Sequence, residues 1–547
     1  MSKKFIFIFL ILIIIVGGIL RLWQLGQIPP SPDWDEVALG YDGYSLIQTG
    51  RDEYGKFLPV VLRSFDDYKP ALYAYLTIPT ILTFGLNVFA VRFPSAIFGI
   101  LSIIAVSFLI RELFERYKHR DILSLLSAFL FAISPWSIQF SRVGFESNVG
   151  VAFNIFTALF FLKGLKKPWL LSVAAFFAGL NLYVYQSEKV FTPILAIMLI
   201  IIFRKELFSK AKKYLLLAFV IGVIVVLPMV IYTATDKSSL LRVKGTSIFS
   251  YQTELLKRDI QKLEQDIQNN DRLGLILDNR RVVYAKTIID GYLSHFNLNW
   301  LFITGDISRH HAPNMGILYL FEFPFILLGI YYLLFGDFSK KTKFLIFGWF
   351  LLAPLPASIT TGVPHAVRTL NFLPTWQIFA ALGIISSIVF VRRFKFLKIL
   401  AVLYLLFALL NIFYYLNQYF VQLSYYDSAD WQYGYKQAVD EAKSLEGKYK
   451  EIVVSDDQPM DKSYMFFLFY LKYPPADYQK IGETSSGGFA SHHSFGKYTF
   501  RPINWNKDSL EKDILFIGTP KEIPAGVNTI KTIYNLDGKE AIKIVGT

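Results

Sequence analysis

The amino-acid sequence predicts a polytopic α-helical membrane protein with about 11 transmembrane helices and a C-terminal soluble α/β domain. Hydrophobic residues make up 54% of the 547 positions and charged residues only 18%, whereas soluble domains carry roughly 25% charged residues. Apolar runs long enough for a bilayer recur over residues 1–416, and the shorter patterns of a soluble fold occupy residues 417–547. We therefore expect a membrane domain followed by a separate extracytoplasmic domain.

The first span is expected at the N-terminus, in the stretch KKFIFIFLILIIIVGGIL. Two lysines precede about 16 apolar residues and no small-residue cleavage site follows, which favours a retained signal-anchor helix over a removed signal peptide. The runs that we expect to cross about 30 Å of hydrocarbon lie near residues 5–21, 93–110, 122–139, 148–162, 169–184, 190–203, 214–233, 314–335, 344–361, 369–391 and 396–416.

A further run, ALYAYLTIPTILTFGL at residues 71–86, is ambiguous because it is short and contains Pro79. If it crossed the membrane, every later loop would change side. Loop charges decide, because Lys and Arg gather on the cytoplasmic side of membrane proteins. With the run outside, the inner segments hold 21 Lys and Arg, while the short outer loops hold three, Arg142, Lys189 and Arg368. We therefore expect residues 71–86 to lie along the outer face.

This topology keeps the N-terminus inside and places three parts on the outer face of the cytoplasmic (inner) membrane: residues 22–92, residues 234–313 and the C-terminal domain. Within the second of these, TELLKRDIQKLEQDIQNNDRL at residues 253–273 has the pattern of an exposed amphipathic helix. The C-terminal domain reads as a helix in YGYKQAVDEAKSL, then short β-branched strands, then a final hairpin with an Asp-Gly turn.

Composition excludes several kinds of function. The chain has no cysteine, so disulfides, thiolate metal sites and cysteine nucleophiles are ruled out. The formal net charge is +14, but most basic residues stand in short patches between apolar runs, as membrane topology requires. We therefore expect membrane lipids and no nucleic acid among the partners.

The outward loops hold nearly all the unusual polar residues. Eight carboxylates follow the first span in SPDWDEVALGYDGYSLIQTGRDEYGKFLPVVLRSFDDYKPALYAYL: Asp33, Asp35, Glu36, Asp42, Asp52, Glu53, Asp66 and Asp67. The other outward candidates are Lys69 and Arg92; Arg142 and Glu146 in SRVGFESN; Asp306, Arg309, His310 and His311 in ITGDISRHHAPN; and His365 and Arg368 in GVPHAVRTL. If SRVGFESN is helical, Arg142 and Glu146 share one face and are expected to pair.

Carboxylates and cations on one membrane face suit a reaction in which an anionic group leaves a lipid while a carboxylate takes a proton from an acceptor. A polyprenyl-phosphate-linked sugar is such a donor, with its phosphate at Lys or Arg and its isoprenoid tail in an apolar groove between helices. Direct attack by an acceptor hydroxyl inverts the anomeric centre and needs one carboxylate as base. Because an ordinary Asp pKa is about 3.9, proton transfer must be concerted with bond formation.

The residues leave several alternatives open. Asp33 rivals Asp35 as the base, since only geometry separates the two. Arg309 or His311 could contact the phosphate, and the other candidates at the mouths of spans are equally compatible with interface anchors. The remaining acids of the first loop are expected to be solvated turn residues: Asp52, Glu53, Asp66 and Asp67.

No cofactor is required by these patterns, although a divalent metal stays open. His310 and His311 invite a zinc site. Adjacent histidines point in different directions, however, and no third ligand is placed by spacing. His365 and Arg368, three residues apart, could face the same cavity.

The motifs DWDEVALGYDGYSL, YKPALYAYL and VRFPSA resemble the first outer loop of the family 39 and family 83 membrane glycosyltransferases, the protein O-mannosyltransferases and lipid A aminoarabinose transferases of GT-C fold. This resemblance implies Asp35 as catalytic base, with Glu36 beside it positioning acceptor or metal. It also implies that Lys69 contacts the donor phosphate, that Arg92 supports the loop or the phosphate, and that Glu146 matches the acidic residue of the second outer loop. The sequence KPAL departs from members with a second proline, which weakens aminoarabinose transfer in particular.

The expected function is therefore an inverting glycosyltransferase, hexosyl- or pentosyl-, with a polyprenyl-phosphate-sugar donor and a protein, lipid or glycan acceptor. The alternative is a transporter or flippase of lipid-linked sugars. Transporters place ionisable residues near the bilayer midplane and often show internal repeats, whereas these spans hold few charges and no repeat is visible. A third hypothesis is a scaffold whose C-terminal domain binds a partner and for which Asp35 is dispensable.

Overall fold

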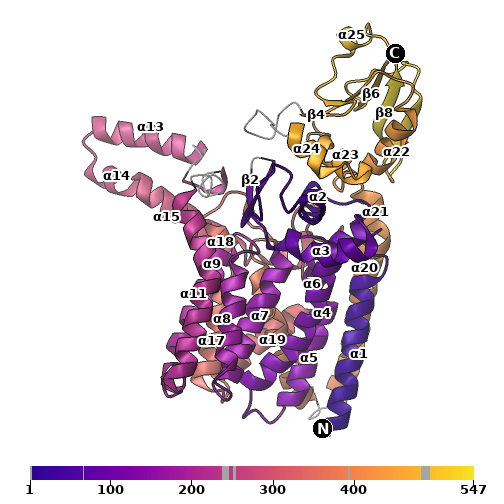
Figure 1. Cartoon of the computed structure of the whole chain (residues 1–547). Helices are drawn as coiled ribbons and strands as arrows, with labels where there is room; N and C mark the ends of the chain where they lie inside the picture. Colours follow the sequence, from indigo (N-terminus) through magenta and orange to yellow (C-terminus); the bar gives the residue numbers. More distant parts are fainter. Residues whose placement is uncertain (1–2, 66, 237–244, 250–253, 392–394, 482–492) are drawn as a thin grey trace.

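The computed structural model describes residues 3–65, 67–236, 245–249, 254–391, 395–481 and 493–547. A bundle of apolar helices has the N-terminus at one end and a small sheet-containing unit at the other (Figure 1). The bundle helices are α1 (Lys3–Leu22), α4 (Val88–Leu113), α5 (Arg120–Ile133), α6 (Pro135–Ser141), α7 (Ser147–Gly164), α8 (Leu170–Asn181), α9 (Glu188–Ile202), α10 (Arg204–Phe208), α11 (Lys212–Thr235), α16 (Phe323–Phe335), α17 (Lys340–Leu352), α18 (Leu355–Ser358), α19 (Thr375–Val391) and α20 (Lys395–Asn417).

Each of the eleven apolar runs contains at least one of these helices. In the described residues, six helices are long and apolar enough to cross a membrane, and a seventh span forms if α5 and α6, bent by 58°, count as one. Four further runs hold shorter helices, α8, α9, α16 and α17, of 12 to 15 residues. The helical membrane architecture is thus as predicted, while eleven complete crossings remain a prediction.

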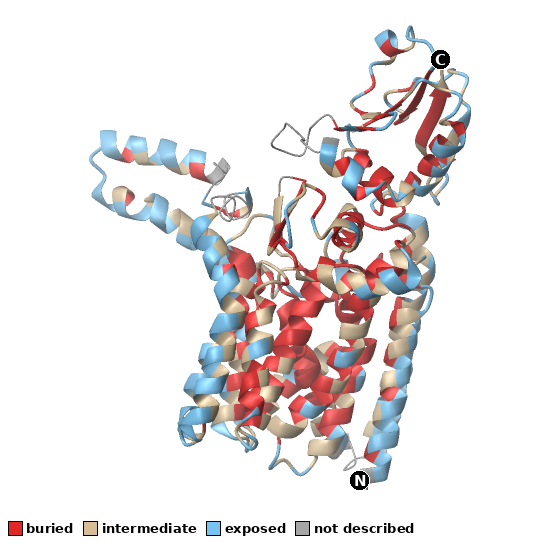
Figure 2. Ribbon diagram, viewed as in Figure 1, coloured by how far each residue is buried: buried red, intermediate tan, exposed pale blue. Residues whose placement is uncertain are grey.

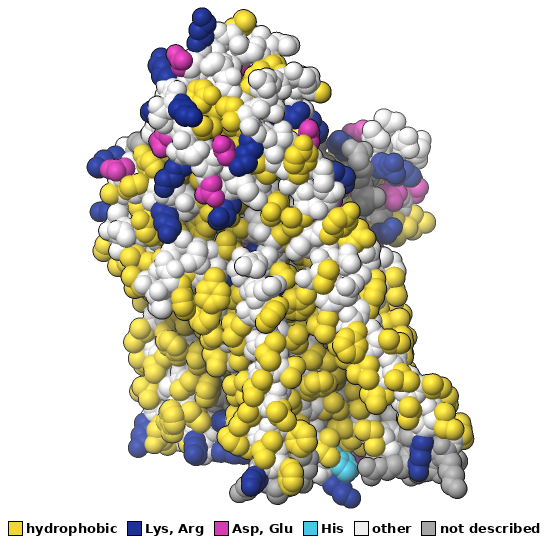
Figure 3. All heavy atoms as spheres, turned by 90° about the vertical axis from the view of Figure 1, so that its right-hand side faces the viewer, with side chains coloured by type: hydrophobic (Ala, Val, Ile, Leu, Met, Phe, Trp, Pro, Cys, Tyr) yellow, Lys and Arg dark blue, Asp and Glu magenta, His cyan; other side chains and the backbone are white. Residues whose placement is uncertain are grey.

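Burial separates central helices from lipid-facing ones. The apolar windows of α7 and α19 are 83% and 78% buried, whereas those of α11 and α20 are 6% and 0% buried. Figure 2 shows the same gradient, with buried residues concentrated in the middle of the bundle. An apolar band covers the face seen in Figure 3, above a rim of Lys and Arg at the N-terminal end. Exposed apolar side chains at this density are what a lipid environment requires.

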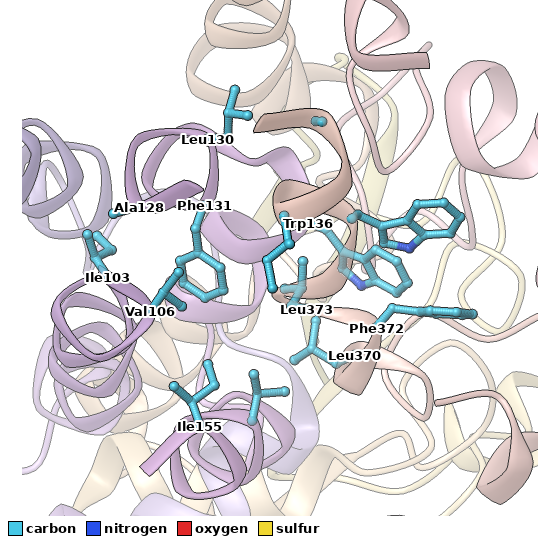
Figure 4. Packing of buried hydrophobic residues seen from close by; sticks show 14 of the residues in the cluster. Ile103, Val106, Ala128, Leu130, Phe131, Trp136, Ile155, Leu370, Phe372 and Leu373 are labelled. Atoms are coloured by element: carbon cyan, nitrogen blue, oxygen red, sulfur yellow. The ribbon is translucent and has the colours of Figure 1, made fainter. Parts of the chain in front are cut away.

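The centre of the bundle is packed by side chains from α4, α5, α7 and η4 (Leu370–Phe372) (Figure 4). Trp136 at the start of α6 is 1% exposed, and its indole N–H donates to the Ala366 carbonyl at 3.2 Å. Its ring centroid lies 6.1 Å from that of Phe372. This contact fixes the chain segment just before η4, which carries residues of the candidate site.

At the end of the bundle opposite the N-terminus, the first loop folds into α2 (Trp34–Thr49), a hairpin of β1 (Val61–Ser64) and β2 (Asp67–Pro70), and α3 (Leu72–Phe84). Figure 1 shows α3 beside α2 at this end of the bundle. A helix of 13 residues is about 20 Å long, short of the roughly 30 Å hydrocarbon core. Helices α8, α16 and α17 are equally short, however, so the placement of residues 71–86 outside the membrane remains a prediction.

Two carboxylates of this loop are buried, contrary to expectation. Asp52 and Glu53 were expected in solvated turns, but each is only 1% exposed. Asp52 Oδ1 accepts the N–H groups of Tyr54 and Lys56 at 3.1 and 2.8 Å, and the Asp52 carbonyl accepts from Gln479 of the C-terminal unit at 2.8 Å. The turn is buried because this unit covers it. Asp66 lies outside the described residues.

The C-terminal unit is a mixed six-stranded sheet with helices, of order β4-β5-β3-β6-β8-β7, in which β3 runs parallel to β5 and β6. The predicted first helix, β-branched strands and Asp-Gly hairpin are all present. Its elements are α22 (Tyr435–Leu445), β3 (Glu451–Val454), α23 (Ser463–Leu471), α24 (Pro475–Ile481), β4 (His493–Phe495), β5 (Tyr498–Phe500), α25 (Trp505–Asp508), β6 (Ile514–Gly518), β7 (Lys531–Tyr534) and β8 (Glu540–Gly546). It joins α20 through η5 (Gln418–Gln422) and α21 (Leu423–Tyr426).

This unit shares one hydrophobic core with the first loop. Val37 and Tyr41 of α2 pack in the same cluster as Phe466 and Phe469 of α23. The Tyr41 hydroxyl also donates to the Tyr473 carbonyl at 3.0 Å. The C-terminal unit therefore closes over the first loop and helps to set the position of α2.

The second outer part forms a helical arm. It comprises α13 (Glu254–Gln268), α14 (Arg272–Leu277) and α15 (Arg280–Ser294), and it projects away from the bundle (Figure 1). The expected amphipathic helix is α13, which ends before Asp271 because that side chain caps α14 through the N–H groups of Leu273 and Gly274. The arm continues into η2 (Trp300–Thr304), after which the chain reaches the site.

Candidate active site

A polar cavity of about 190 Å³ lies where the first loop meets the ends of the bundle helices opposite the N-terminus. Residues from six separate segments line it. They are Asp33, Trp34, Asp35, Lys69, Pro70, Phe145, Glu146, Tyr185, Gln186, Ile307, Arg309, His310, His365, Val367 and Arg368. Eight of the candidates named in the sequence analysis are among them: Asp33, Asp35, Lys69, Glu146, Arg309, His310, His365 and Arg368.

The start of α2 orients the acidic residues of the first loop. Asp33 is the N-cap, and its carboxylate accepts the Asp35 N–H at 2.7 Å. Glu36 reaches back so that its carboxylate accepts the Asp33 N–H at 2.9 Å, which completes a capping box. The cap fixes the first turn and leaves the Asp35 side chain directed to the cavity. Carboxylates in this turn are also favoured by the helix dipole.

Asp33 and Asp35 occupy different environments. The Asp33 side chain is fully buried and pairs with Arg309. Burial raises the pKa of Asp33, and the Arg309 charge opposes that rise. The Asp35 side chain is 32% exposed and forms an ion pair with Lys69. Asp33 is thus committed to the cap and to Arg309, whereas Asp35 remains accessible from the cavity.

Lys69 reaches the cavity from β2. The hairpin pairs Leu62 with Lys69, and the lysine is only 7% exposed. Burial lowers the pKa of Lys69, but the nearby carboxylates Asp35 and Glu146 raise it more, so its pKa is raised overall. The cavity therefore holds a buried cation that stays protonated.

Glu146 stands at the N-terminal end of α7 and is 5% exposed. Burial raises its pKa to about 7, against the opposing charge of Lys69. The expected pairing of Arg142 with Glu146 is wrong. Helix α6 ends at Ser141 and α7 begins at Ser147, so the two residues do not share a helical face, and Glu146 turns instead toward Lys69.

Glu36 and Arg92 lie outside the cavity and form a buried ion pair. Arg92 Nε donates to Glu36 Oε1 at 2.8 Å and Nη2 to Oε2 at 3.0 Å, with both side chains 0% exposed. Arg92 also donates to the carbonyls of Pro29 and Ser31. Glu36 accepts the Gly144 N–H at 2.7 Å. The pair therefore joins the first loop to the segment before α7.

Arg142 is likewise buried and faces away from the cavity. It donates to the carbonyls of Leu20 and Ile28, each at 3.0 Å, and its guanidinium lies 4.8 Å from the Phe420 ring centroid. These contacts tie the end of α1 to η5. Like Arg92, this arginine braces the entrance of the first loop and does not line the cavity.

Arg368 enters the cavity from the segment before η4. Its guanidinium donates to the Thr360 hydroxyl and the Thr361 carbonyl, both at 2.6 Å. The same segment brings His365 into the cavity wall. The spacing of three residues therefore does place His365 and Arg368 on one cavity.

Asp306, His310 and His365 bring ligand atoms within 4.8 Å of one another, a grouping that could hold a metal ion. His365 Nδ1 is buried without a hydrogen-bond partner in the described residues. His311 is not in this group, because its Nδ1 lies 2.6 Å from the Ala312 carbonyl and it does not line the cavity. Sequence spacing missed the cluster because His365 comes from a distant loop.

Sequence reasoning also missed Trp34 and Gln186. The Trp34 ring centroid lies 4.0 Å from the Arg309 guanidinium and 3.8 Å from Lys462 Nζ. Because Lys462 belongs to the C-terminal unit, this unit reaches the cavity wall. Gln186 Nε2 donates to the Tyr68 carbonyl at 2.9 Å and so holds β2 beside the α8–α9 connection. In the sequence, Trp34 stands between the acids Asp33 and Asp35, and this position was the only indication that it lies at the site.

Comparisons with known proteins agree with this architecture. Residues 68–232 match the family model of the dolichyl-phosphate-mannose-protein mannosyltransferases. The structure of ArnT from Cupriavidus metallidurans bound to undecaprenyl phosphate superposes with a TM-score of 0.54 at 11% identity, covering 100% of this chain and 98% of that one. No curated protein matches the sequence significantly.

The oligosaccharyltransferase of Archaeoglobus fulgidus, tethered to an acceptor peptide, gives a TM-score of 0.49 at 12% identity over 86% of this chain. The present chain spans 63% of the length of that protein. The match to ArnT covers both the bundle and the C-terminal unit, and the family model covers part of the bundle. The chain therefore has the GT-C fold, and the match of residues 68–232 to the mannosyltransferase family model agrees with the expected resemblance to the family 39 and family 83 membrane glycosyltransferases.

Proposed function

We propose that this protein is an inverting glycosyltransferase that moves a sugar from a polyprenyl-phosphate carrier to an acceptor at the outer face of the cytoplasmic membrane. The observation that carries the proposal is the cavity in which Asp35, Glu146, Lys69, Arg309 and Arg368 meet at one end of an apolar bundle. The family match to dolichyl-phosphate-mannose-dependent enzymes and the undecaprenyl phosphate bound by ArnT support this donor class.

The donor phosphate is assigned to the cations of the cavity. Lys69 is buried and protonated, and Arg309 and Arg368 reach the same space from the opposite loops. Cations in a partly dry site stabilise an anionic group much more than cations in water do. At about 190 Å³ the cavity is smaller than the roughly 300–1,000 Å³ of common ligand pockets. That size suits the head of a ligand whose tail lies elsewhere.

The isoprenoid tail is assigned to a second cavity of about 530 Å³. Almost all its lining residues are apolar, and nearly all come from α7, α8, α9, α10 and α11. The two cavities share one stretch of chain. Leu182 and Thr192 line the apolar cavity, and Tyr185 and Gln186, which lie between them in the sequence, line the polar cavity. A lipid held here would present its phosphate beside Lys69.

Asp35 is assigned as the base. Its side chain is partly exposed to the cavity, whereas that of Asp33 is buried as a helix cap and paired with Arg309. In the reaction, the acceptor oxygen forms a bond to the anomeric carbon while the bond from that carbon to the phosphate oxygen breaks. The hydroxyl proton passes to Asp35, and the polyprenyl phosphate leaves with the bonding electrons.

When phosphate approaches Lys69, the ion pair of Lys69 with Asp35 weakens, and the freed carboxylate can accept the proton. Loading the donor and activating the base are then one event. This coupling would keep the base paired with Lys69 until a donor occupies the site.

Asp306, His310 and His365 are assigned as a divalent metal site. One carboxylate and two histidines are a common ligand set for Zn²⁺ and related ions. The unpartnered Nδ1 of His365 fits such a role. A bound cation would add positive charge beside the phosphate, and the three residues would also anchor the two loops that carry Arg309 and Arg368.

The orientation follows from the charge distribution. The basic segments at residues 111–120, 163–167 and 204–213 lie between bundle helices, and the cavity lies at the opposite end from the N-terminus. Basic loops favour the cytoplasmic side. The cavity and the C-terminal unit would then face outward.

The proposal is tested with purified protein in detergent. Native mass spectrometry should detect one bound undecaprenyl phosphate, and a panel of polyprenyl-phosphate hexoses and pentoses should show sugar transfer to membrane-extract acceptors with release of free polyprenyl phosphate. The accepted sugar and acceptor decide between hexosyl and pentosyl transfer. Transport of a lipid-linked sugar across proteoliposomes with no transfer would overturn the proposal in favour of a flippase.

A further inference from the structure

A buried carboxylate below the cavity, Glu188, joins four elements of the bundle. Glu188 is the first residue of α9 and is 1% exposed. Its carboxylate accepts hydrogen bonds from Asn154 Nδ2 at 2.6 Å, from Asn371 Nδ2 at 2.7 Å and from Asn181 Nδ2 at 3.3 Å. These donors belong to α7, η4 and α8. All three asparagines are at most 1% exposed.

The network continues between the donors themselves. Asn154 also donates to Asn371 Oδ1 at 2.8 Å, and the Thr192 hydroxyl donates to Asn154 Oδ1 at 2.8 Å. Space for the carboxylate comes from Gly150 of α7, where an added Cβ would lie 2.8 Å from Glu188 Cγ. The side chains of α7, α8 and η4 therefore surround the Glu188 carboxylate closely.

Three of the elements joined by Glu188, namely α7, α9 and η4, begin next to a cavity residue. Glu146 stands at the start of α7, two turns before Asn154. Gln186 lies two residues before the start of α9, and Arg368 lies two residues before the start of η4. One carboxylate thus sits beneath three walls of the cavity, although it does not line the cavity itself.

A buried carboxylate bonded by neutral groups is unusual for a contact whose role is only structural. A carboxylate inside a membrane bundle is costly and is commonly functional. Among the residues that the structure describes, no Lys or Arg forms an ion pair with Glu188, and neutral amides and hydroxyls supply all its contacts. A hydrogen bond to a charged group is stronger and more directional than one between neutral groups. A carboxylate can hold donors on both of its oxygens, which an amide cannot do.

We propose that Glu188 is a positioning residue for the transferase, which holds Glu146, Gln186 and Arg368 in their places around the cavity. This inference rests on the proposed function. Glutamine at this position presents an N–H₂ group to one of the asparagine N–H₂ groups, so either the tie to α7 or the tie to η4 is lost. The loss moves a cavity wall without removing any group that touches the substrate.

The test compares Glu188→Gln, Glu188→Asp and Ser124→Ala as full-length proteins in detergent. Ser124 is a matched control, because it is a fully buried polar residue that joins two helices. Its hydroxyl on α5 donates to the Ser107 carbonyl of α4 at 2.8 Å, and neither residue lines the polar cavity. Glu188→Gln should lower kcat/KM per folded molecule by about 10- to 100-fold, the range for a hydrogen bond to a charged group. Glu188→Asp should recover most of that loss, and Ser124→Ala should stay within about threefold of the wild type.

Two readouts separate positioning from a general loss of stability. The double variant Glu188→Gln with Glu146→Gln should lose less activity than the two single effects combined, because one acts through the other. Asn371→Ala, which cuts only the tie to η4, should weaken binding of undecaprenyl phosphate by about tenfold, and it serves as the second variant if Glu188→Gln does not fold. Loss of activity only in proportion to lost folded protein would overturn the inference.

Failure of this inference is distinguishable from failure of the proposed function. If Glu188→Gln is fully active while Asp35→Asn is inactive, the positioning role is wrong and the transferase assignment stands. If the wild-type protein binds undecaprenyl phosphate but transfers no sugar from any donor, the proposed function is wrong, and the effect of Asn371→Ala on lipid binding still tests the tie between Glu188 and Arg368.

Discussion

Lys69 on β2 forms an ion pair with Asp35 on α2 at the wall of the polar cavity. The hairpin and the capped helix are separate elements, so the pair depends on the fold of the whole first loop. It places the proposed base beside the proposed phosphate ligand. The same contact explains why acidic and basic residues gather in this part of an otherwise apolar chain.

Replacing Lys69 is expected to impair donor binding most. Lys69→Met removes the buried cation, and KM for a polyprenyl-phosphate sugar should rise by about 10- to 100-fold, since a charge-assisted contact is worth roughly 1.5–3 kcal/mol. The control is Lys56→Met in the same loop, because Lys56 is half-exposed and contacts Asp236 at 3.9 Å away from the cavity. Equal effects of both changes on KM would contradict the assignment.

Replacing Arg92 is expected to act on stability. Arg92→Ala leaves Glu36 buried without its partner, which typically costs about 3–5 kcal/mol. Arg111→Ala is the control, since its 3.3 Å pair with Asp121 is about one-third exposed and should contribute less than about 1 kcal/mol. Thermal unfolding in detergent measures both. A normal unfolding temperature for Arg92→Ala combined with a raised KM would instead place Arg92 at the phosphate.

Glu146 is expected to make stability depend on pH. Its pKa in the folded protein is about 7, above the roughly 4.3 of an unfolded chain, so folding favours the protonated form. This contribution is complete below pH 4 and is lost as the pH rises from about 4 through 7, by about 3.7 kcal/mol at most. Unfolding temperatures of the wild type and Glu146→Gln from pH 5 to pH 8 check the sign. The unfolding temperature of Glu146→Gln should rise relative to that of the wild type as the pH rises. A difference between the two temperatures that stays constant with pH would contradict the shifted pKa.

The metal assignment is tested by elemental analysis. The wild-type protein, purified without chelator and supplied with Zn²⁺, should retain about one ion per chain, and His310→Ala and His365→Ala should retain far less because two of three ligands are too few. His311→Ala is the matched control, since this neighbour hydrogen-bonds to the Ala312 carbonyl. Retention of metal by all three variants would show that the ion binds elsewhere.

Much of the fold was predictable because apolar length and loop charge are local properties. Each expected run contains helix, and α3 stays short beside the first loop. The broken entry to α7 was not predictable in this way. Four-residue spacing suggested an Arg142–Glu146 pair, but the chain leaves the helix at Ser141 and resumes it at Ser147. Tertiary contacts, namely the Leu20 and Ile28 carbonyls, attract Arg142 instead.

The site was predictable where a motif carried it and hidden where only folding assembles it. Asp35 and Lys69 stand in motifs, and both line the cavity. Glu36 and Arg92 stand in the same motifs, but they pair in the interior, because spacing does not reveal which carboxylate a cap directs inward. The cluster of Asp306, His310 and His365 and the ties of Glu188 join distant segments, and no single stretch of sequence carries them.

The most direct test of the central claim compares Asp35→Asn, Asp33→Asn and Asp67→Asn in one transfer assay with polyprenyl-phosphate sugars. Asp35→Asn should unfold at the wild-type temperature, bind undecaprenyl phosphate and lose transfer by at least about 100-fold, the usual scale of a general base. Asp33→Asn keeps a side chain that can cap α2 but removes the buried charge that pairs with Arg309, so it should chiefly lower the unfolding temperature, and Asp67→Asn should change little. Transfer by Asp35→Asn within a few-fold of the wild type would contradict the account.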